Sequence, residues 1–254
     1  MRVKILGCGA SGGVPLVTGK WGVCDPQNPK NRRRRASIAI EEKGTTLLVD
    51  TSPDLREQCL AANIQQINAV VYTHDHADHT HGIDDLRPFL YAQKNPIPLY
   101  GNAETIHFLT TRFGYAFPSE TMPPEVYRPF ATPHIIKGPF EIGDIPIVPF
   151  IQGHGYSTSM GYRFGKVAYS TDVVTLDEEA FQTLEGIETW IVDCIAMDPR
   201  STHSHLAQTL AWIERVKPRR AYLTHMSPLL DYDTLASLLP KGVEPAYDGL
   251  VIEV

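Results

Sequence analysis

The segment from residue 74 to residue 79 constrains the fold and chemistry of this chain more than any other feature. Residues 68–73 (Asn-Ala-Val-Val-Tyr-Thr) form an apolar run that predicts a buried β-strand. This run is followed at once by His74, His76, Asp78 and His79. Because alternate side chains of an extended backbone point the same way, His74 and His76 share one side. Imidazole nitrogens and carboxylate oxygens ligate divalent cations, so the segment predicts a metal site.

Three further predicted strands also end in a potential metal ligand. The apolar runs over residues 145–151, 166–171 and 220–224 lead to His154, Asp172 and His225. In an α/β sheet, ligands gather beyond one edge, where the ends of several strands meet. Each of these residues alone is more often structural. Four strands that deliver seven candidate ligands to one edge indicate a single metal centre.

Length and composition restrict the class of protein. The 254 residues, 43% hydrophobic and 20% charged, suit a globular α/β protein, and we expect residues 1–254 to form a single domain. The formal net charge of −6 gives no general attraction to nucleic acid or to an anionic membrane. We find neither the apolar length of a transmembrane span nor the apolar core of a signal peptide. The four cysteines are scattered without a CxxC pair, and a cytoplasmic location is the expectation.

Two segments leave alternatives open. The glycine-rich segment 7–13 (Gly-Cys-Gly-Ala-Ser-Gly-Gly) follows a predicted strand but matches neither GxGxxG nor a P-loop. It favours a tight turn that needs positive φ over phosphate binding by backbone N–H groups. The run from Arg32 to Arg35 is the only basic cluster. It is either a solvated face or, for one or two of its members, an anion-binding site.

Strand and helix patterns alternate along much of the remaining chain. Residues 45–50 are predicted to form a strand that pairs as a hairpin with residues 38–41 across Lys43-Gly44. The segment from Asp50 to Pro53 is predicted to cap a helix over residues 55–62. Further helices are expected over residues 83–91 and 102–113, with a strand over 96–100 between them. The proline-dense stretch 117–133 is predicted to be a surface excursion or a lid on the substrate side.

In kind and order, the seven candidate ligands resemble the HxHxDH…H…D…H signature of the metallo-β-lactamase superfamily. The resemblance implies an α/β fold, the four-layer αββα metallo-β-lactamase sandwich, with a two-metal site at one sheet edge. The implied ligands of the first metal ion are His74, His76 and His154. Those of the second are Asp78, His79 and His225, and Asp172 bridges the two. The implied cofactor is two divalent metal ions per chain, zinc or manganese.

Within the superfamily, the chain resembles the tRNA 3′-processing endonucleases and the phosphonate-pathway cyclic phosphodiesterases. The similar segments are the opening GCGASGGVP, the pair HSHLA and LTHMS, and the terminal YDGL. Alignment back from His225 places the catalytic histidine of that group on His203, with His205 as the alternative. Asp193 resembles the acidic partner of this histidine. Asp78 is counted with the catalytic residues as well as with the ligands, and no substrate-binding residue is assigned.

The chain departs from both groups in ways that bear on its substrate. Only Cys24 remains of the cysteine-rich zinc knuckle of the cyclic phosphodiesterases. The tRNA enzymes carry a long, often basic arm, whereas the stretch 132–149 is too short for one and the chain is acidic. We therefore expect a small phosphodiester or nucleotide-like partner, neither tRNA nor a membrane, and a homodimer is a candidate assembly. A true β-lactamase would normally carry an export signal.

These observations predict a dinuclear-metal-dependent hydrolase. The favoured activity is that of a phosphodiesterase that cleaves small cyclic or nucleotide-like phosphodiesters through a metal-bridging hydroxide. His203 is the candidate that protonates the departing alkoxide. The alternative is hydrolysis of a thioester, lactone or amide by the same metal site. A third alternative is a metal-holding binding protein without turnover, against which the complete ligand set argues.

Overall fold

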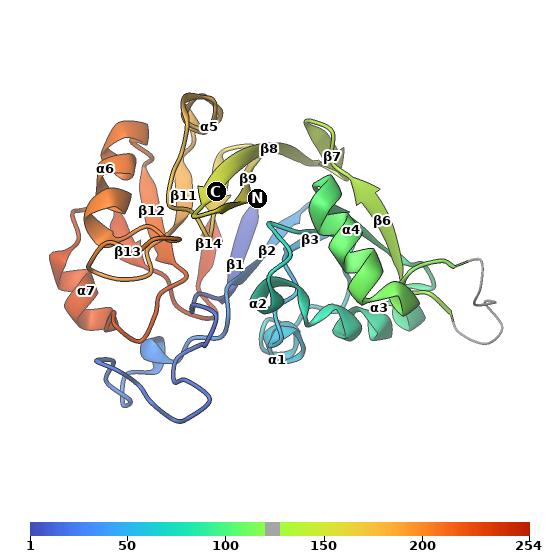
Figure 1. The fold of residues 1–254 in the computed structure, drawn as a ribbon, viewed down its shortest axis with the longest axis horizontal. Helices are drawn as coiled ribbons and strands as arrows, with labels where there is room; N and C mark the ends of the chain where they lie inside the picture. Colours follow the sequence, from blue (N-terminus) through green and yellow to red (C-terminus); the bar gives the residue numbers. More distant parts are fainter. Residues whose placement is uncertain (120–127) are drawn as a thin grey trace.

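The structure, a computed structural model, describes residues 1–119 and 128–254. Two seven-stranded mixed β-sheets pack face to face, and helices cover their outer faces (Figure 1). The expected four-layer α/β sandwich is confirmed. Part of the proline-dense stretch, residues 120–127, lies outside the described residues.

Each sheet combines antiparallel hairpins with a run of parallel strands. The first has the order β14-β1-β2-β3-β4-β5-β6, with β1 Arg2–Gly7, β2 Ser37–Glu42, β3 Thr45–Val49, β4 Ala69–Val71, β5 Ile97–Gly101, β6 Ala131–Ile135 and β14 Val251–Glu253. The second has the order β13-β12-β11-β10-β9-β8-β7, with β7 Phe140–Ile142, β8 Ile145–His154, β9 Ser157–Phe164, β10 Val167–Ser170, β11 Thr189–Asp193, β12 Arg220–Thr224 and β13 Val243–Pro245.

The helices are short, and most follow a strand. They are α1 Leu55–Ala61, α2 Ala77–Thr80, α3 Arg87–Gln93, α4 Ala103–Arg112, α5 Glu178–Leu184, α6 Leu206–Val216 and α7 Tyr232–Leu238, with 3₁₀ turns η1 Pro29–Asn31, η2 Ile83–Leu86 and η3 Gly114–Ala116. Apolar residues of α1, α3 and α4 pack on the outer face of the first sheet. Those of α5, α6 and α7 belong to a second core cluster, which fills the space between the sheets and continues past the second sheet.

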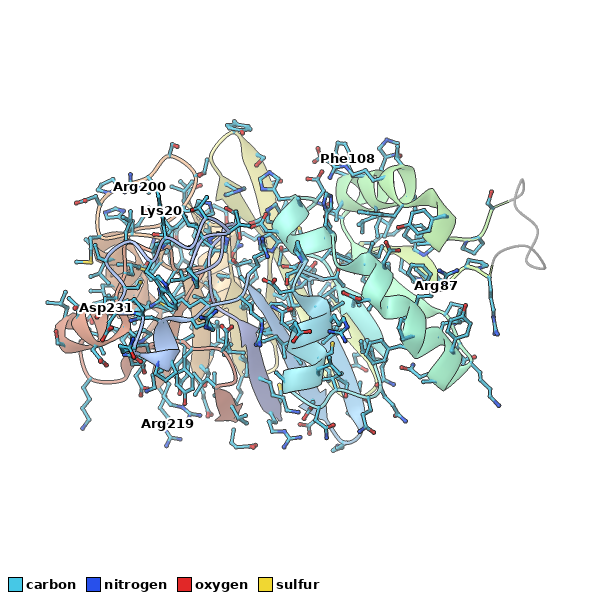
Figure 2. The ribbon with its side chains drawn as sticks, turned by 90° about the horizontal axis from the view of Figure 1, so that it is seen from below. Lys20, Arg87, Phe108, Arg200, Arg219 and Asp231 are labelled. Atoms are coloured by element: carbon cyan, nitrogen blue, oxygen red, sulfur yellow. The ribbon has the colours of Figure 1, made fainter. Side chains whose placement is uncertain are left out.

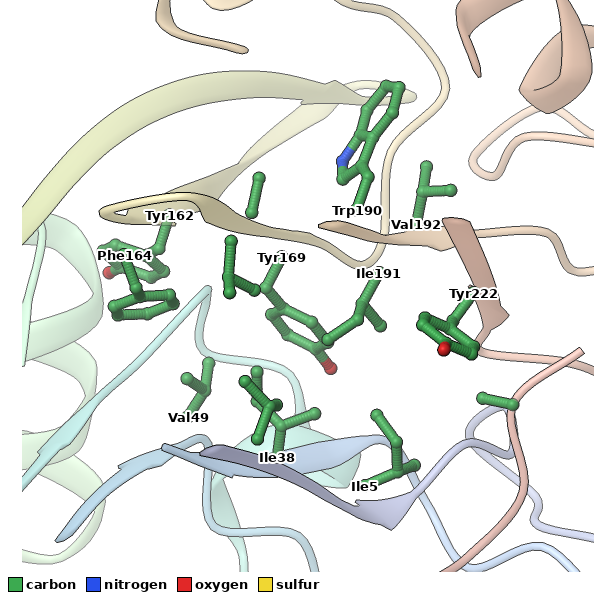
Figure 3. Close-up of a cluster of buried hydrophobic side chains, with 14 of the residues drawn as sticks. Ile5, Ile38, Val49, Tyr162, Phe164, Tyr169, Trp190, Ile191, Val192 and Tyr222 are labelled. Carbon is green, nitrogen blue, oxygen red and sulfur yellow. The ribbon is translucent and has the colours of Figure 1, made fainter. Parts of the chain in front are cut away.

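The core follows the two-residue period of the strands. In β2, Ile38 and Ile40 belong to the cluster between the sheets, whereas Ala39 belongs to the outer cluster under α1 and α3. In β11, Ile191 points toward the first sheet, and Trp190 and Val192 point away from it (Figure 3). A strand buried on both faces shows no polar alternation in its sequence, which is why β4 and β11 read as continuous apolar runs.

Two hydrogen bonds join the sheets beside the end of β4. The Tyr162 hydroxyl donates to the Tyr72 carbonyl at 2.6 Å, and the Met160 N–H donates to the Thr73 carbonyl at 2.8 Å. Both donors lie in β9, a strand that the sequence patterns did not predict. These contacts fix the backbone from which His74 projects.

Two local predictions were wrong. The segment from Asp50 to Pro53 does not cap α1; Asp54 is the N-cap residue, and its carboxylate binds Arg35 instead of the helix. The stretch 117–133 is not wholly a surface excursion, because β6 begins at Ala131 and pairs with Ile97 of β5. Pro133 is tolerated there because β6 is the edge strand, which has a partner on one side only.

Candidate metal centre

The ends of five strands from both sheets meet at one edge of the sandwich. Asp50 follows β3, His74 lies just beyond β4, His154 ends β8, Asp172 lies just beyond β10 and His225 follows β12. Asp50, Asp172 and His225 have positive φ values of 65°, 53° and 55°. Such backbone is unfavourable for residues other than glycine and tends to cluster at functional sites. The chain thus bends sharply at three strand ends to present these side chains.

One group of side chains contains three histidines and one aspartate. His74, His76, His154 and Asp172 each offer a ligand atom, and these atoms lie within 4.8 Å of one another. Oδ1 of Asp172 is 3.8 Å from Nε2 of His74 and 3.7 Å from Nε2 of His154. His76 is the exposed member, whereas the other three are buried. This group could hold one cation.

A second group lies on the other side of the same aspartate. Asp78, His79 and His225 offer ligand atoms that also lie within 4.8 Å of one another. Oδ2 of Asp172 is 3.1 Å from Nε2 of His79 and 3.5 Å from Nε2 of His225. The two oxygens of one buried carboxylate therefore face two different groups of ligands. Such a carboxylate is placed to touch two cations at once.

The chemistry of these donors fits metal ions. Nε2 of His74, His79 and His225 is buried without a hydrogen-bond partner, although buried polar atoms are normally paired. Neutral imidazole nitrogens and ionised carboxylates are the donor types that zinc and similar divalent cations accept. A cation in each group would satisfy the unpaired nitrogens and balance the carboxylates.

The side chains of the two groups interact strongly through their charges. Burial would raise the pKa of Asp172, but the neighbouring His225, His79 and His74 hold it well below its usual range. Burial opposes charge on His225 too, yet Asp172, Asp78 and Asp193 together raise its pKa to about 9. Burial, reinforced by the charge on His79, holds the pKa of His74 well below its usual value. The ionised carboxylates concentrate negative charge at the buried edge.

Asp50 orients a histidine in each group, a role that the sequence patterns did not reveal. Its Oδ2 lies 2.7 Å from Nδ1 of His79 and accepts a 2.8 Å hydrogen bond from the Thr73 hydroxyl. The Thr73 oxygen is in turn 3.0 Å from Nδ1 of His74. Because that hydroxyl donates to Asp50, it accepts the Nδ1 proton of His74 and leaves Nε2 free for a ligand. The signal in the sequence is an aspartate directly after a buried strand, although the local pattern predicts that it belongs to a helix cap.

Nδ1 of His154 makes a comparable contact, 2.7 Å from the Thr202 carbonyl. The proton on Nδ1 donates to that carbonyl, so Nε2 faces the cluster with its lone pair. This contact also ties the β8–β9 hairpin to the loop that carries His203.

His203 and Asp193 lie together beside the ligand groups. Nδ1 of His203 is 2.9 Å from Oδ2 of the fully buried Asp193, and its Nε2 is 3.8 Å from Oδ1 of Asp172. The rings of His203 and His225 stack at 4.7 Å. Asp172, His203 and His225 themselves form a third group of closely spaced donors. His205, by contrast, is the N-cap residue of α6 and does not line the pocket at the cluster.

A small pocket opens onto these groups. Its volume is about 170 Å³. It is lined by His76, Asp78, His154, Asp172, His203 and His225, together with Ser11, Tyr156, Ser157 and Thr202. Ser11 belongs to the glycine-rich turn, in which Gly13 has a φ of 65°, as a tight turn requires. The turn therefore contributes a side chain to the pocket as well as a change of chain direction.

The arginine run serves the structure around the site. The buried Arg33 donates to the Ser227 carbonyl, and Arg35 donates to the Ser11 carbonyl and to Asp54. Arg32 lies over the ring of Trp21. None of the four lines the pocket. All four cysteines are free and buried, and within the described residues none belongs to a group that could hold a metal.

The fold and this set of donors define a metal-dependent hydrolase of the metallo-β-lactamase type. A sequence-family profile described as a beta-lactamase superfamily domain matches residues 45–226, which include all seven candidate ligands. The chain belongs to the beta-lactamase superfamily.

Individual proteins are similar over the full length of the chain. A diphosphatase from the PhnP family, whose structure is known, is 32% identical in sequence to this chain. The two structures superpose with a TM-score of 0.89, and the match covers 100% of this chain and 97% of that one. The structure of the short form of human tRNase Z has a TM-score of 0.68 at 18% identity, with 100% of this chain and 99% of that one covered. At that identity the likeness is one of fold.

A protein of Porphyromonas gingivalis named octanoyltransferase is 29% identical over 257 residues. The match takes in 98% of this chain but 51% of that protein, so the chain spans about half the length of that curated relative. Among the helices that the structure describes, we find none with the length and apolar character needed to span a bilayer.

Proposed function

We propose that residues 1–254 act as one hydrolase domain that cleaves small cyclic or nucleotide-like phosphodiesters with two divalent cations, zinc or manganese. The observation that carries this proposal is the position of the Asp172 carboxylate between the two groups. Its Oδ1 faces His74 and His154, and its Oδ2 faces His79 and His225. A site for one cation would need only one of these groups.

Seven side chains would hold the cations. The first cation would be held by His74, His76 and His154, the second by Asp78, His79 and His225, and both by Asp172. Two cations in such a site polarise a phosphoryl group, activate water at neutral pH and stabilise the charge that develops during displacement. The histidine orientations set by Asp50 and by the Thr202 carbonyl prepare the Nε2 atoms for this task.

His203 would supply the proton that the leaving oxygen needs. The Asp193 carboxylate accepts the Nδ1 proton at 2.9 Å, which directs Nε2 into the pocket. A buried carboxylate in that position also stabilises the imidazolium before it gives up its Nε2 proton. The histidine would release this proton as the ester bond breaks and would recover one from solvent afterwards.

One of the comparisons supports phosphoryl transfer over carbonyl chemistry. The structure that is 32% identical over the full chain is called a diphosphatase, which names a phosphorus substrate. A large nucleic-acid substrate is not part of the proposal. Residues 131–154 are taken up by β6, β7 and β8 with short connections, which leaves no room there for an arm that could hold a tRNA.

A substrate panel tests the proposal. Metal-loaded protein would be assayed with bis(p-nitrophenyl) phosphate, a 2′,3′-cyclic nucleotide, a precursor tRNA, a lactone and a thioester. We expect turnover of the two small phosphodiesters and none of the tRNA. Faster hydrolysis of the lactone or thioester than of either phosphodiester would contradict it, as would efficient removal of a tRNA 3′ trailer.

A further inference from the structure

Tyr156 is an aromatic residue that lines the pocket and is exposed to solvent. Its exposed fraction is 96%, whereas Tyr91 and Tyr115, the other exposed large aromatic side chains among the described residues, are 59% and 37% exposed. Within the described part of the chain we find no hydrogen bond or ring contact made by this side chain. Single exposed aromatic residues are ordinary on protein surfaces. Tyr156 differs because it belongs to the lining of the pocket that holds the candidate ligands.

The backbone that carries Tyr156 is held firmly. His154 and Ser157 are paired across β8 and β9, so Gly155 and Tyr156 form a two-residue turn. Gly155 has a φ of 68°, which glycine adopts without strain. A Cβ atom at Gly155 would lie 2.7 Å from Cγ2 of Thr202, so the turn packs directly on the loop that leads to His203. The backbone at the tip of the hairpin is therefore held in place beside the candidate acid, and the Tyr156 side chain projects from that tip.

The pocket is too small to hold a whole nucleotide-type substrate. Seen from below, the tip of the β8–β9 hairpin projects between the segment that carries Arg200 and helix α4, on which Phe108 is labelled (Figure 2). The pocket itself measures about 170 Å³, which is small beside the several hundred Å³ of a typical pocket for a whole organic ligand. A phosphate group beside the ligand cluster would fill much of this space. The organic part of a substrate must then lie at the rim of the pocket, where the exposed Tyr156 side chain is located.

We infer that Tyr156 is a specificity-determining residue whose ring stacks on the nucleobase of a nucleotide-type substrate. This inference rests on the proposed phosphodiesterase function and specifies which phosphodiesters the site prefers. The face of a base and the face of a phenol ring attract one another through stacking and the exclusion of water. Stacking of this kind accepts any base, so we assign a preference for nucleotides over base-free sugar phosphates and none for a particular base.

Equilibrium binding tests the inference without turnover. Calorimetry on metal-loaded protein would compare adenosine 5′-monophosphate with ribose 5-phosphate, which has the same phosphate and sugar but no base. We expect the wild-type protein to bind the nucleotide roughly 10-fold more tightly. Tyr156→Ala should remove this preference and leave the affinity for ribose 5-phosphate unchanged, and Tyr156→Phe should retain it. Tyr91→Ala, which removes an exposed tyrosine of α3 outside the pocket, is the matched control.

The outcomes separate this inference from the proposed function. Equal binding of the two ligands by wild-type protein, failure of both to bind, or a preference that survives in Tyr156→Ala would overturn the stacking role. Hydrolysis of bis(p-nitrophenyl) phosphate is measured on the same preparation. Turnover without a nucleotide preference would refute the inference alone, whereas a Tyr156-dependent preference without turnover would refute the phosphodiesterase proposal alone.

Discussion

Oδ2 of Asp50 lies 2.7 Å from Nδ1 of His79, and both side chains are completely buried. The contact determines which nitrogen of this histidine carries the proton and which faces Asp172. Through the Thr73 hydroxyl, the same carboxylate also orients His74 in the other group of ligands. One residue that touches no cation in the proposed arrangement thus organises both halves of the centre.

Replacing this carboxylate should weaken metal binding. Asp50→Asn retains the size of the side chain, but its amide cannot accept hydrogen bonds at all the atoms that Asp50 uses. We expect the affinity for the cations to fall roughly 10- to 100-fold, as is typical when the partner of a ligating histidine is lost. Dissociation constants from competition with a chelator measure the effect. Asp54→Asn, which alters a carboxylate paired with Arg35, is the control. Unchanged metal affinity in Asp50→Asn would refute the orienting role.

Removal of Asp172 should damage the centre more than any other single change. The substitution Asp172→Ala takes one ligand from both proposed cations, so each is left under-coordinated. We expect elemental analysis of the dialysed variant to find less than one cation per chain, with circular dichroism confirming that the protein is folded. If the folded variant retained a full complement of tightly bound metal, Asp172 could not be the bridging residue.

The role of His203 predicts a dependence on the leaving group. His203→Ala should cost roughly 10²–10⁴ in turnover for a phosphodiester with an alkoxide leaving group, because that oxygen needs a proton. The loss should be far smaller for a p-nitrophenyl ester, whose phenolate departs without one. The metal content should stay unchanged. Steady-state rates with both substrates measure this difference.

His205→Ala is the matched control for this experiment, since His205 lies two residues away and outside the pocket lining. We expect a smaller loss that is the same for both leaving groups. Equal losses on both esters in His203→Ala would count against the acid role. Loss of metal in that variant would instead make His203 a ligand, as its position beside Asp172 and His225 would allow.

Asp248 should make stability depend on pH. Burial raises the pKa of this carboxyl to about 6, an effect that the Arg34 N–H and the Arg34 charge only partly offset. Because the folded pKa lies above the unfolded one, this contribution to stability is complete below pH 4 and is lost as pH rises through about 6. Between pH 5 and pH 8 the loss should be roughly 1–2 kcal/mol. Urea unfolding should show a smaller decline for Asp248→Asn, and parallel pH profiles would contradict this account.

Local patterns in the sequence predicted an α/β protein and the gathering of seven candidate ligands at one sheet edge, whereas the four-layer sandwich was implied by the resemblance to the metallo-β-lactamase superfamily. The apolar runs before His74, Asp172 and His225 mark strands buried on both faces, which tolerate no polar alternation. The run before His154 belongs to β8, in which exposed apolar residues such as Ile151 alternate with buried ones. Where such a run stops at a histidine or aspartate, the residue lies at the sheet edge. The structure brings all of these residues to one edge.

Features that depend on contacts between distant segments could not be predicted in this way. Asp50 was assigned to a helix cap because capping is a local pattern, whereas its real partners are Thr73 and His79. The role of the run from Arg32 to Arg35 could not be predicted, because the sequence does not show which of four adjacent arginines is buried. In the structure Arg33 is buried against the Ser227 carbonyl, nearly two hundred residues away in the chain. Strand β6 was missed because Pro133 argues against a strand unless that strand is known to be at an edge.

A metal titration tests whether two cations held around Asp172 support the hydrolysis of phosphodiesters. Metal-free protein would be loaded stepwise with zinc or manganese, and hydrolysis of bis(p-nitrophenyl) phosphate would be measured against the metal bound per chain. We expect activity to rise to a plateau at about two cations per chain. Full activity at one cation per chain, or no hydrolysis at two, would contradict this expectation.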